Sequence, residues 1–166
     1  MNNIFDERYL EDMSNMRFIS DNTYHIEQSK LYQGLEGNVK TVEFIRVKGD
    51  KLLLVEAKTT FPNPANSEES FSTQIDEICD KFIHSLQLYS SVKVGVNDEV
   101  FEEGFVPPEK ISLIFILVIK SCESKWCRRV KNTIKNNLPK YINRIWKPVI
   151  YVINHEIAVK RELVVA

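Results

Sequence analysis

Two glutamates and a lysine near the middle of the chain have the residue types that bind a divalent cation. Glu43 is followed, after twelve intervening residues, by Glu56, and Lys58 comes two residues later. Mg²⁺ prefers carboxylate oxygens and keeps several waters. A neighbouring lysine can orient or activate one of these waters, or stabilise charge that develops on a phosphate. The pattern is therefore compatible with a site in which Glu43 and Glu56 hold a metal and Lys58 orients or activates a water.

The two glutamates come together if the segments that carry them form a β-hairpin. Two β-type runs, 38–48 and 51–60, are separated by a single Gly-Asp pair, which is typical of a two-residue turn. In that register Glu43 lies opposite Glu56, with Lys58 on the same face. Opposed carboxylates destabilise a hairpin unless a positive charge lies between them, and a divalent cation would supply it. In the alternative interpretation the strand ends are solvent-exposed and Lys58 simply pairs with one acid.

Hydrophobic periodicity and capping signals predict the other elements of the chain. We expect, in chain order, a short helix at 3–16, a strand at 23–31, a long helix that Ser67 caps, an irregular segment at 91–110, a buried strand at 111–119, a helix from Glu123 to Leu138 with a further turn after Pro139, a strand at 149–153 and a last short strand at 157–164. The irregular segment could be a lid, a contact loop or disordered. This order predicts one α/β (α+β) domain over 1–166, with a mixed central sheet flanked by helices.

Charge is strongly segregated along the chain although the net charge is only −1. Residues 1–119 carry a charge of −9, whereas residues 120–147 carry +8. Five basic residues of the helix at 123–138 fall away from its apolar stripe; they are Lys125, Arg128, Arg129, Lys131 and Lys135. Such a face either is solvated or binds phosphates. Together with a metal site in the same domain, it favours nucleic acid as the partner.

The hairpin residues resemble the motif of the PD-(D/E)XK nuclease superfamily. Val42-Glu43 precedes Glu56-Ala57-Lys58 on an apolar strand, although Val42 replaces the proline of the motif and Glu43 its usual aspartate. The resemblance implies an αβββαβ core over residues 3 to about 119, with a C-terminal αβ extension at 120–166. It also implies that Glu43 and Glu56 bind Mg²⁺ while Lys58 assists the attacking water.

Many members of that superfamily add a further acidic or polar group to the site. The candidates in this chain are Glu7, Glu11 and Asp12 on the first predicted helix, Glu27 on the first predicted strand, and Gln74 beside the apolar stripe of the following helix. The spacing singles out none of them.

The sequence thus favours an enzyme, a Mg²⁺- or Mn²⁺-dependent nuclease, with DNA favoured over RNA as substrate. The alternative is a catalytically inactive nuclease-fold module that acts in nucleic-acid binding or protein–protein interaction. The longest apolar run, 111–119, is too short to span a membrane, and the acidic N-terminus is unlike a signal peptide. We therefore expect a cytoplasmic protein with no membrane partner. Whether it forms a homodimer is left open by the sequence.

Overall fold

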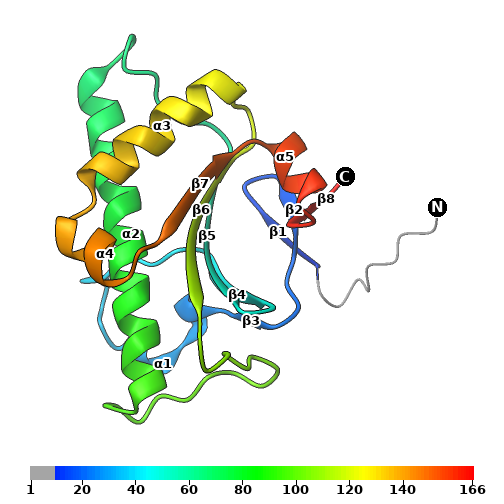
Figure 1. Cartoon of the computed structure of the whole chain (residues 1–166), viewed down its shortest axis with the longest axis vertical. Coiled ribbons are helices and arrows are strands. Elements are labelled where there is room, and N and C mark those ends of the chain that lie inside the picture. The colour runs from blue at the N-terminus through cyan, green and yellow to red at the C-terminus, as the bar shows by residue number, and fades with distance from the viewer. Residues whose placement is uncertain (1–9) are drawn as a thin grey trace.

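Two sheets and the helices packed against them form the architecture of this mixed α/β protein (Figure 1). The computed structural model describes residues 10–166. Within these residues a five-stranded mixed sheet, here called the central sheet, has the order β3-β4-β5-β6-β7. A three-stranded antiparallel sheet, here called the small sheet, has the order β1-β2-β8. The expected fold class, a mixed central sheet flanked by helices, is confirmed.

The central sheet combines an antiparallel half with a parallel half. Its strands are β3 (Thr23–Tyr24), β4 (Phe44–Lys48), β5 (Lys51–Lys58), β6 (Ser112–Ile119) and β7 (Val149–Ile153). The strands β3, β4 and β5 pair antiparallel, whereas β5, β6 and β7 pair parallel. Parallel neighbours need long crossovers. Three helices provide them, namely α2 (Glu68–Val94), α3 (Ser124–Asn137) and α4 (Lys140–Ile145).

The predicted hairpin register is confirmed where β4 and β5 pair. Lys48 lies opposite Lys51 and Ile45 opposite Leu54. Gly49 adopts a positive φ of 65° in the connecting turn, a conformation that costs glycine little. The ladder ends at the pair Phe44–Val55, so the predicted pair Glu43–Glu56 is not part of it.

Helix α2 lies along one face of the central sheet and begins at the predicted Ser67 cap, but it runs to Val94, past the start of the irregular segment expected at 91–110. The Ser67 hydroxyl accepts a hydrogen bond from the Ser70 N–H at 3.2 Å, and Gly95 ends the helix at φ 77°. The Phe82 ring stacks on the Phe115 ring of β6 at 4.6 Å between centroids. Helix α3 packs on the same sheet face beside α2 (Figure 1), with Val130 and Ile134 buried in the shared core. This layer also encloses the ion pair between Glu56 and Lys81.

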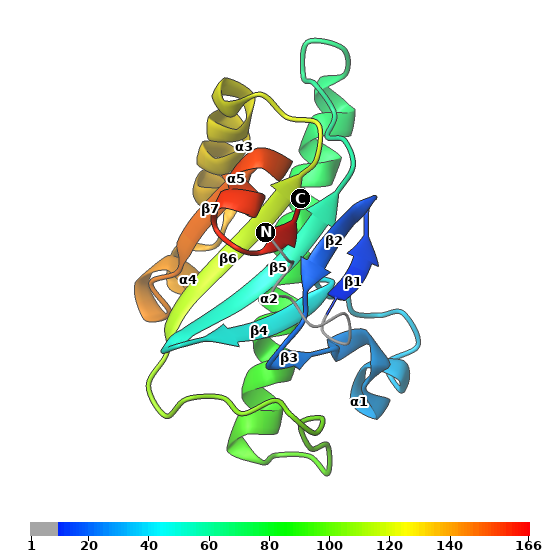
Figure 2. The same ribbon diagram turned by 90° about the vertical axis from the view of Figure 1, so that its right-hand side faces the viewer.

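The opposite face of the central sheet is covered in part by the small sheet and by α5 (His155–Lys160), as Figure 2 shows. The small sheet consists of β1 (Leu10–Met13), β2 (Met16–Ile19) and β8 (Val164–Val165). Phe18 of β2 packs edge-on against Phe44 of β4 with centroids 5.6 Å apart. The C-terminal part of the chain contributes a strand to each sheet, β7 to the central sheet and β8 to the small sheet.

Two predictions for the N-terminal region are wrong. Residues 10–13 and 16–19 form strands rather than the end of a helix over 3–16; the first nine residues lie outside the described part. Ser14 and Asn15 make the connecting turn with positive φ values of 50° and 60°, which a helix pattern does not anticipate.

The strand predicted at 23–31 is also too long, because it ends at Tyr24. A 3₁₀ turn (Ile26–Gln28) and the short helix α1 (Lys30–Gln33) follow it. The Ser29 hydroxyl caps α1 by accepting from the Tyr32 N–H at 3.1 Å.

The last predicted strand, at 157–164, is replaced by α5 and only two strand residues in β8. Asn154 caps this helix, since its Oδ1 accepts a hydrogen bond from the Ile157 N–H at 3.0 Å. Lys160 also pairs with Glu156 one turn earlier, at 2.7 Å. Local capping thus favours a helix where the apolar residues had suggested a strand.

The irregular segment between α2 and β6 is anchored rather than detached from the domain. The Phe101 ring packs edge-on against Tyr24, with centroids 5.2 Å apart. Glu102 contacts the His25 ring Nδ1 at 3.0 Å, and Glu11 of β1 contacts the Nε2 of the same ring. His25 therefore links β1 to the loop, and Glu99 accepts a further hydrogen bond from the Leu31 N–H at 3.0 Å.

None of the helices between residues 10 and 166 combines the length and the apolar character that a membrane span requires.

The His25 contacts predict a pH dependence of stability. Burial lowers the pKa of His25, but the hydrogen bond and charge of Glu102 and the charge of Glu11 outweigh it, so the pKa is raised above 6.5. Because the folded protein holds this proton more tightly than the unfolded chain, the stabilisation is present below the unfolded pKa. It is lost as pH rises through the folded pKa. We expect His25→Gln to lower the free energy of unfolding by about 1–2 kcal/mol near pH 6 and by less near pH 8.5.

Urea unfolding at the two pH values, monitored by circular dichroism, measures this difference. His155→Gln is the matched control, since the His155 side chain makes no salt bridge among residues 10–166. An equal loss of stability for His25→Gln at both pH values would contradict the charged contact.

Candidate functional site

Glu56 is a charged side chain inside an otherwise apolar layer. Alternate residues of β5 point to the same face of the sheet, so Glu56 continues the row of Leu52 and Leu54 beneath α2. Its side chain is only 1% exposed. A buried carboxylate is unfavourable unless it is paired or hydrogen-bonded. The structure therefore needs cationic partners at this position.

Two lysines provide positive charge at the Glu56 carboxylate. Lys81 of α2 donates a hydrogen bond from its Nζ to Glu56 Oε1 at 2.6 Å. Lys58 of β5 places its Nζ 3.7 Å from the same oxygen and 3.9 Å from Glu77 Oε1 on α2. The other carboxylate oxygen, Glu56 Oε2, is buried and has no hydrogen-bond partner within the described chain. One oxygen is therefore neutralised, while the second is enclosed in the protein without a hydrogen-bond partner in the described chain.

Helix α2 also positions Glu43, which lies at the bend just before β4. The Ser85 hydroxyl accepts a hydrogen bond from the Val42 N–H at 2.9 Å, and His84 Nδ1 accepts one from the Lys40 N–H at 3.1 Å. The Glu43 N–H donates to the Val55 carbonyl at 3.0 Å. The extended segment before β4 is thus held between β5 and α2, and Glu43 is held half-buried next to Glu56.

The carboxylates at this site ionise less readily than usual. Burial raises the pKa of Glu56 to about 7, against the lowering effect of Lys81 and Lys58, and the charge of Glu43 raises it further. Burial also raises the pKa of Glu43, and the negative charge of Glu27 raises it further. Glu43 is therefore close enough to interact electrostatically with both Glu27 and Glu56. Perturbed acids clustered beside lysines are typical of functional sites, although structural ion pairs cause similar shifts.

The structure brings together some of the predicted site residues and separates others. Glu43, Glu56 and Lys58 form one cluster, and exposed Glu27 lies at its margin, where its Oε1 is 3.5 Å from Thr41 Oγ1. Glu11 does not join the cluster, because its carboxylate contacts His25 instead.

The other predicted additions to the site differ in where they lie. Gln74 is half-buried on α2, one helical turn before Glu77, and no side-chain hydrogen bond holds it within the described part. Asp12 of β1 is 3.5 Å from Arg17 of β2. Glu7 lies outside the described residues.

Lys81 and Glu77 are the residues of this cluster that the sequence prediction missed. They lie four residues apart on α2, and Gln74, Glu77 and Lys81 recur along one flank of its apolar stripe. This polar line next to a buried stripe is the signal that could have identified them. The spacing along the helix does not, however, indicate that Glu56 of β5 is the partner of Lys81.

The predicted basic face lies on the same side of the central sheet as Glu56, but on the other flank of α2. Helix α3 contacts α2 through Trp126 and Phe71, whose centroids are 5.9 Å apart, and Asn137 donates to Asp76 at 2.7 Å. At about 100° per residue, Asp76 points to the flank of α2 opposite Lys81. Helix α2 therefore separates the carboxylates from α3.

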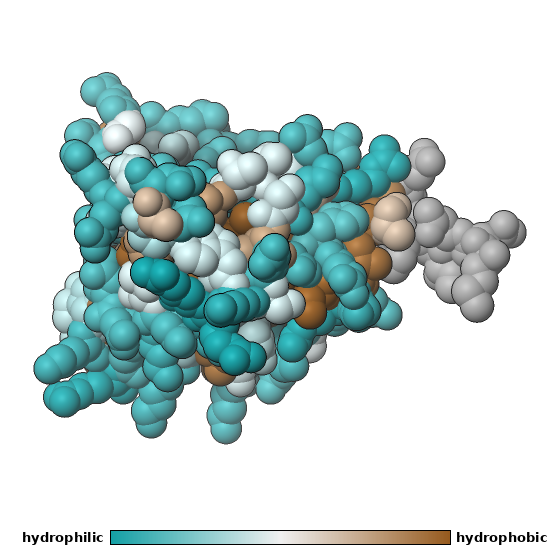
Figure 3. Space-filling model, turned by 90° about the horizontal axis from the view of Figure 1, so that it is seen from above, coloured by the Kyte–Doolittle hydropathy of each residue, from teal (hydrophilic) through white to brown (hydrophobic). Residues whose placement is uncertain are grey.

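The five basic residues of α3 all reach solvent to some degree. Lys125, Arg128, Arg129 and Lys135 are exposed, and Lys131 is half-buried. The Arg129 guanidinium stacks over the Trp126 ring at 5.5 Å. Seen from the end where α2 and α3 begin, the surface is mostly hydrophilic, with small apolar areas between the polar side chains (Figure 3). A polyanion could bind to this surface through its phosphates.

The donor set at the carboxylates fits one divalent cation that keeps most of its water. The unpartnered Glu56 Oε2 and the neighbouring Glu43 supply two carboxylates, as Mg²⁺ sites often do. Among residues 10–166 no group of three or more His, Cys, Asp or Glu side chains could hold a metal ion. The fit is therefore to a hydrated cation on two carboxylates, not to a closed protein cage.

The Glu56–Lys81 pair predicts a large effect of Lys81→Met on stability. Since the folded pKa of Glu56, about 7, exceeds the ordinary value of 4.5, its ionisation costs stability as pH rises between these two values. Without Lys81 the buried charge has only Lys58 nearby. We expect a loss of about 3–5 kcal/mol near pH 8.5 and a clearly smaller loss near pH 5, where Glu56 is protonated in the fold.

Chemical unfolding at both pH values measures the effect. Lys93→Met, at an exposed position of the same helix, should change stability by under about 0.5 kcal/mol. The double substitution Glu56→Leu with Lys81→Met should recover most of the loss, because it removes both charges. A loss for Lys81→Met that does not depend on pH would show that Lys81 acts through packing instead.

The whole chain was compared with known proteins. No protein-family model matches it, and neither a curated protein nor a solved structure does so.

Proposed function

We propose that this protein is a Mg²⁺-dependent nuclease, or a nuclease-like domain, that hydrolyses phosphodiester bonds of nucleic acid. One observation carries the proposal: the buried Glu56 carboxylate has an unpartnered oxygen and lies beside Glu43 and Lys58. A purely structural ion pair would not need a second, half-buried acid close to the first. The resemblance of Val42-Glu43 and Glu56-Ala57-Lys58 to the PD-(D/E)XK motif points to the same chemistry.

Each residue of the cluster would have a separate role. Glu43 and Glu56 would hold the cation, which would activate water and neutralise charge on the scissile phosphate. Lys58, one quarter exposed, would orient the attacking water or stabilise the charge that develops on the phosphate. Lys81 would keep Glu56 ionised and fixed in place through its 2.6 Å hydrogen bond. Lys81 is thus a positioning residue.

The basic face of α3 supports the proposal that the substrate is a nucleic acid. Only the motif resemblance favours DNA over RNA. Both the carboxylates and α3 lie on the α2 side of the central sheet. A polynucleotide that reaches both must cross α2, and the contact between Phe71 and Trp126 shows that α3 lies close to the first turn of α2. We therefore propose that the substrate crosses the beginning of α2, where it would also pass the exposed acids Glu68 and Glu69.

A second candidate function is an inactive nuclease-fold module that binds nucleic acid or another protein. The observation that favours it is the position of Lys81, whose ammonium group already neutralises Glu56 Oε1. A site whose acid is satisfied by lysines can be stable without a metal. Self-association as a homodimer belongs to this alternative and remains a proposal.

Cleavage of linear DNA and of RNA with Mg²⁺ or Mn²⁺ tests the catalytic proposal. We expect Glu56→Gln and Lys58→Ala each to reduce the cleavage rate by at least about 100-fold, because each removes a group that acts on the cation or on the reacting phosphate. Glu36→Gln, at an exposed position away from the cluster, should leave the rate unchanged.

Thermal unfolding of every variant must accompany the assay, since Glu56 is buried. Equal rates in the parent and in both site variants would refute the catalytic assignment. Binding without cleavage on any substrate would favour the inactive module.

The basic face predicts a specific salt dependence of binding. Replacing Lys125, Arg128 and Arg129 together by glutamine should weaken binding uniformly across sequences. It should also lower the slope of log K against log salt concentration by up to about 3 for double-stranded DNA. Fluorescence anisotropy at several salt concentrations measures this slope. Replacing Lys30, Lys93 and Lys110, three exposed lysines outside α3, is the matched control. An unchanged slope for the α3 variant would show that α3 is only a solvated face.

A further inference from the structure

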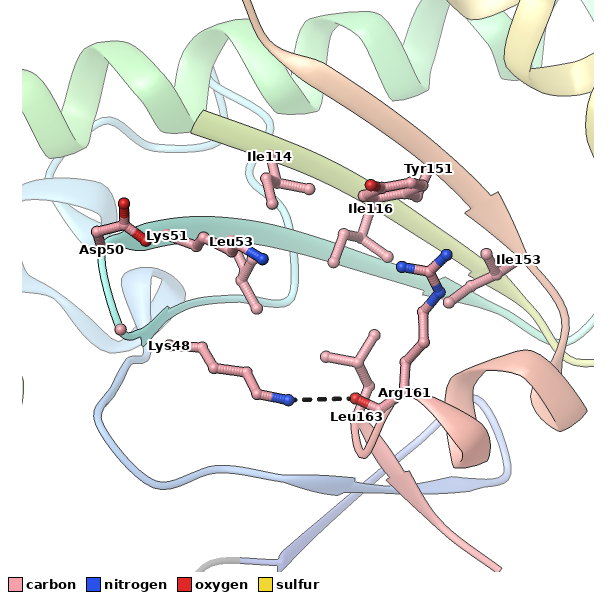
Figure 4. Close-up of a pocket in the computed structure, with 11 residues that line it drawn as sticks. Lys48, Asp50, Lys51, Leu53, Ile114, Ile116, Tyr151, Ile153, Arg161 and Leu163 are labelled. Carbon is pink, nitrogen blue, oxygen red and sulfur yellow. Dashed lines mark hydrogen bonds between the residues drawn. The ribbon is translucent and has the colours of Figure 1, made fainter. Parts of the chain in front are cut away.

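A separate cavity lies on the face of the central sheet opposite α2. Its volume is about 380 Å³, which falls in the range of small-molecule sites. It opens between the β4–β5 turn on one side and the segment after α5 on the other (Figure 4). Leu53 of β5 points into it, whereas its neighbour Leu54 faces α2. The cavity is therefore separated from Glu56 by the sheet itself.

The floor of the cavity is apolar. The side chains that form it come from β5, β6, β7 and the C-terminal segment, and they are Leu53, Ile114, Ile116, Ile153 and Leu163. The Tyr151 ring of β7 lies at one end of this floor, as Figure 4 shows. Such a floor binds the apolar body of a ligand but gives no preference for charge.

The two rims of the cavity carry cationic side chains. Lys48 and Lys51 lie at the turn rim, and Arg161 lies at the opposite rim with its guanidinium 4.7 Å from the Tyr151 ring centroid (Figure 4). Lys48 donates to the Arg161 carbonyl at 3.3 Å and lies 3.9 Å from Glu162. Within the described chain neither Lys51 nor the Arg161 side chain forms a salt bridge.

One acid, Asp50, also lines the turn rim, next to Lys51. The opposite rim, around Arg161, carries no acidic lining residue among those described. A ligand anion is therefore favoured at the Arg161 end, where the stacked guanidinium keeps hydrogen-bond donors available.

We propose that this cavity is a binding site for a small amphipathic anion, an aromatic carboxylate whose ring lies on the aliphatic floor and whose carboxylate pairs with Arg161. The volume limits the ligand to one or two rings. The apolar floor and the Tyr151 ring favour a flat apolar body over a sugar or a polar chain. The guanidinium fork favours a carboxylate, which it can bind through two parallel hydrogen bonds.

Binding of 1-naphthoate to the full chain tests this site. We expect saturable one-to-one binding by titration calorimetry, with amide shifts of the ¹⁵N-labelled protein concentrated on Leu53, Ile116 and Leu163. The neutral analogue 1-naphthalenemethanol should bind about tenfold more weakly, and Arg161→Gln should lower the naphthoate affinity by about tenfold or more.

The controls separate charge recognition from simple apolar partition. Lys93→Gln on α2 should leave the affinity unchanged, and Arg161→Gln is at an exposed position where the fold is expected to tolerate it. Equal affinities for naphthoate and the neutral analogue would overturn the proposed carboxylate contact. Absence of binding at millimolar concentration, or amide shifts centred on residues outside the cavity, would overturn the site altogether.

Discussion

The ion pair between Glu56 and Lys81 joins the middle strand of the central sheet to the longest helix. It lies in a layer that is otherwise apolar, and an unpaired carboxylate there would cost several kcal/mol. Helix α2 is therefore fixed in its rotation about its own axis, because only one flank can present Lys81 to β5. The same rotation brings Ser85 to the Val42 N–H, which holds the segment that carries Glu43. The position of both acids thus depends on one helix orientation.

That pair also determines which chemistry is available at the site. Lys81 occupies Oε1 of Glu56, and Oε2 stays buried without a partner among residues 10–166. A fully satisfied pair would be a structural device only, whereas a bare carboxylate would take up a proton. The observed arrangement is intermediate, since one oxygen is paired with Lys81 and the other is buried without a partner in the described chain. It is compatible with catalysis and with a binding module. The two functions differ in whether a cation binds at the unpartnered oxygen.

The parts of the fold that the sequence predicted are those with strong local signals. Gly-Asp between two apolar runs determined the β4–β5 register, and Ser67 with the apolar stripe determined the start of α2. The predictions fail where residues with weak secondary-structure preferences form a turn or cap a helix. Ser14 and Asn15 form a tight turn without a glycine, and Asn154 starts a helix where a strand was expected. In each case a side chain or a positive φ decided the structure, not hydrophobic periodicity.

Tertiary contacts explain why the candidate site could be predicted only in part. The hairpin alone brings Glu43 towards Glu56, but Lys81 is 25 residues away from Glu56 and reaches it only through helix packing. The same limit applies to the charge segregation along the chain. The positive segment packs beside the negative one, yet α2 separates α3 from the carboxylates, with Asp76 and Asp80 exposed on the helix between them. A polyanion bound on α3 therefore meets acidic side chains all along this part of α2, Asp76 and Asp80 in its middle and the exposed Glu68 and Glu69 in its first turn, where only the helix dipole is favourable.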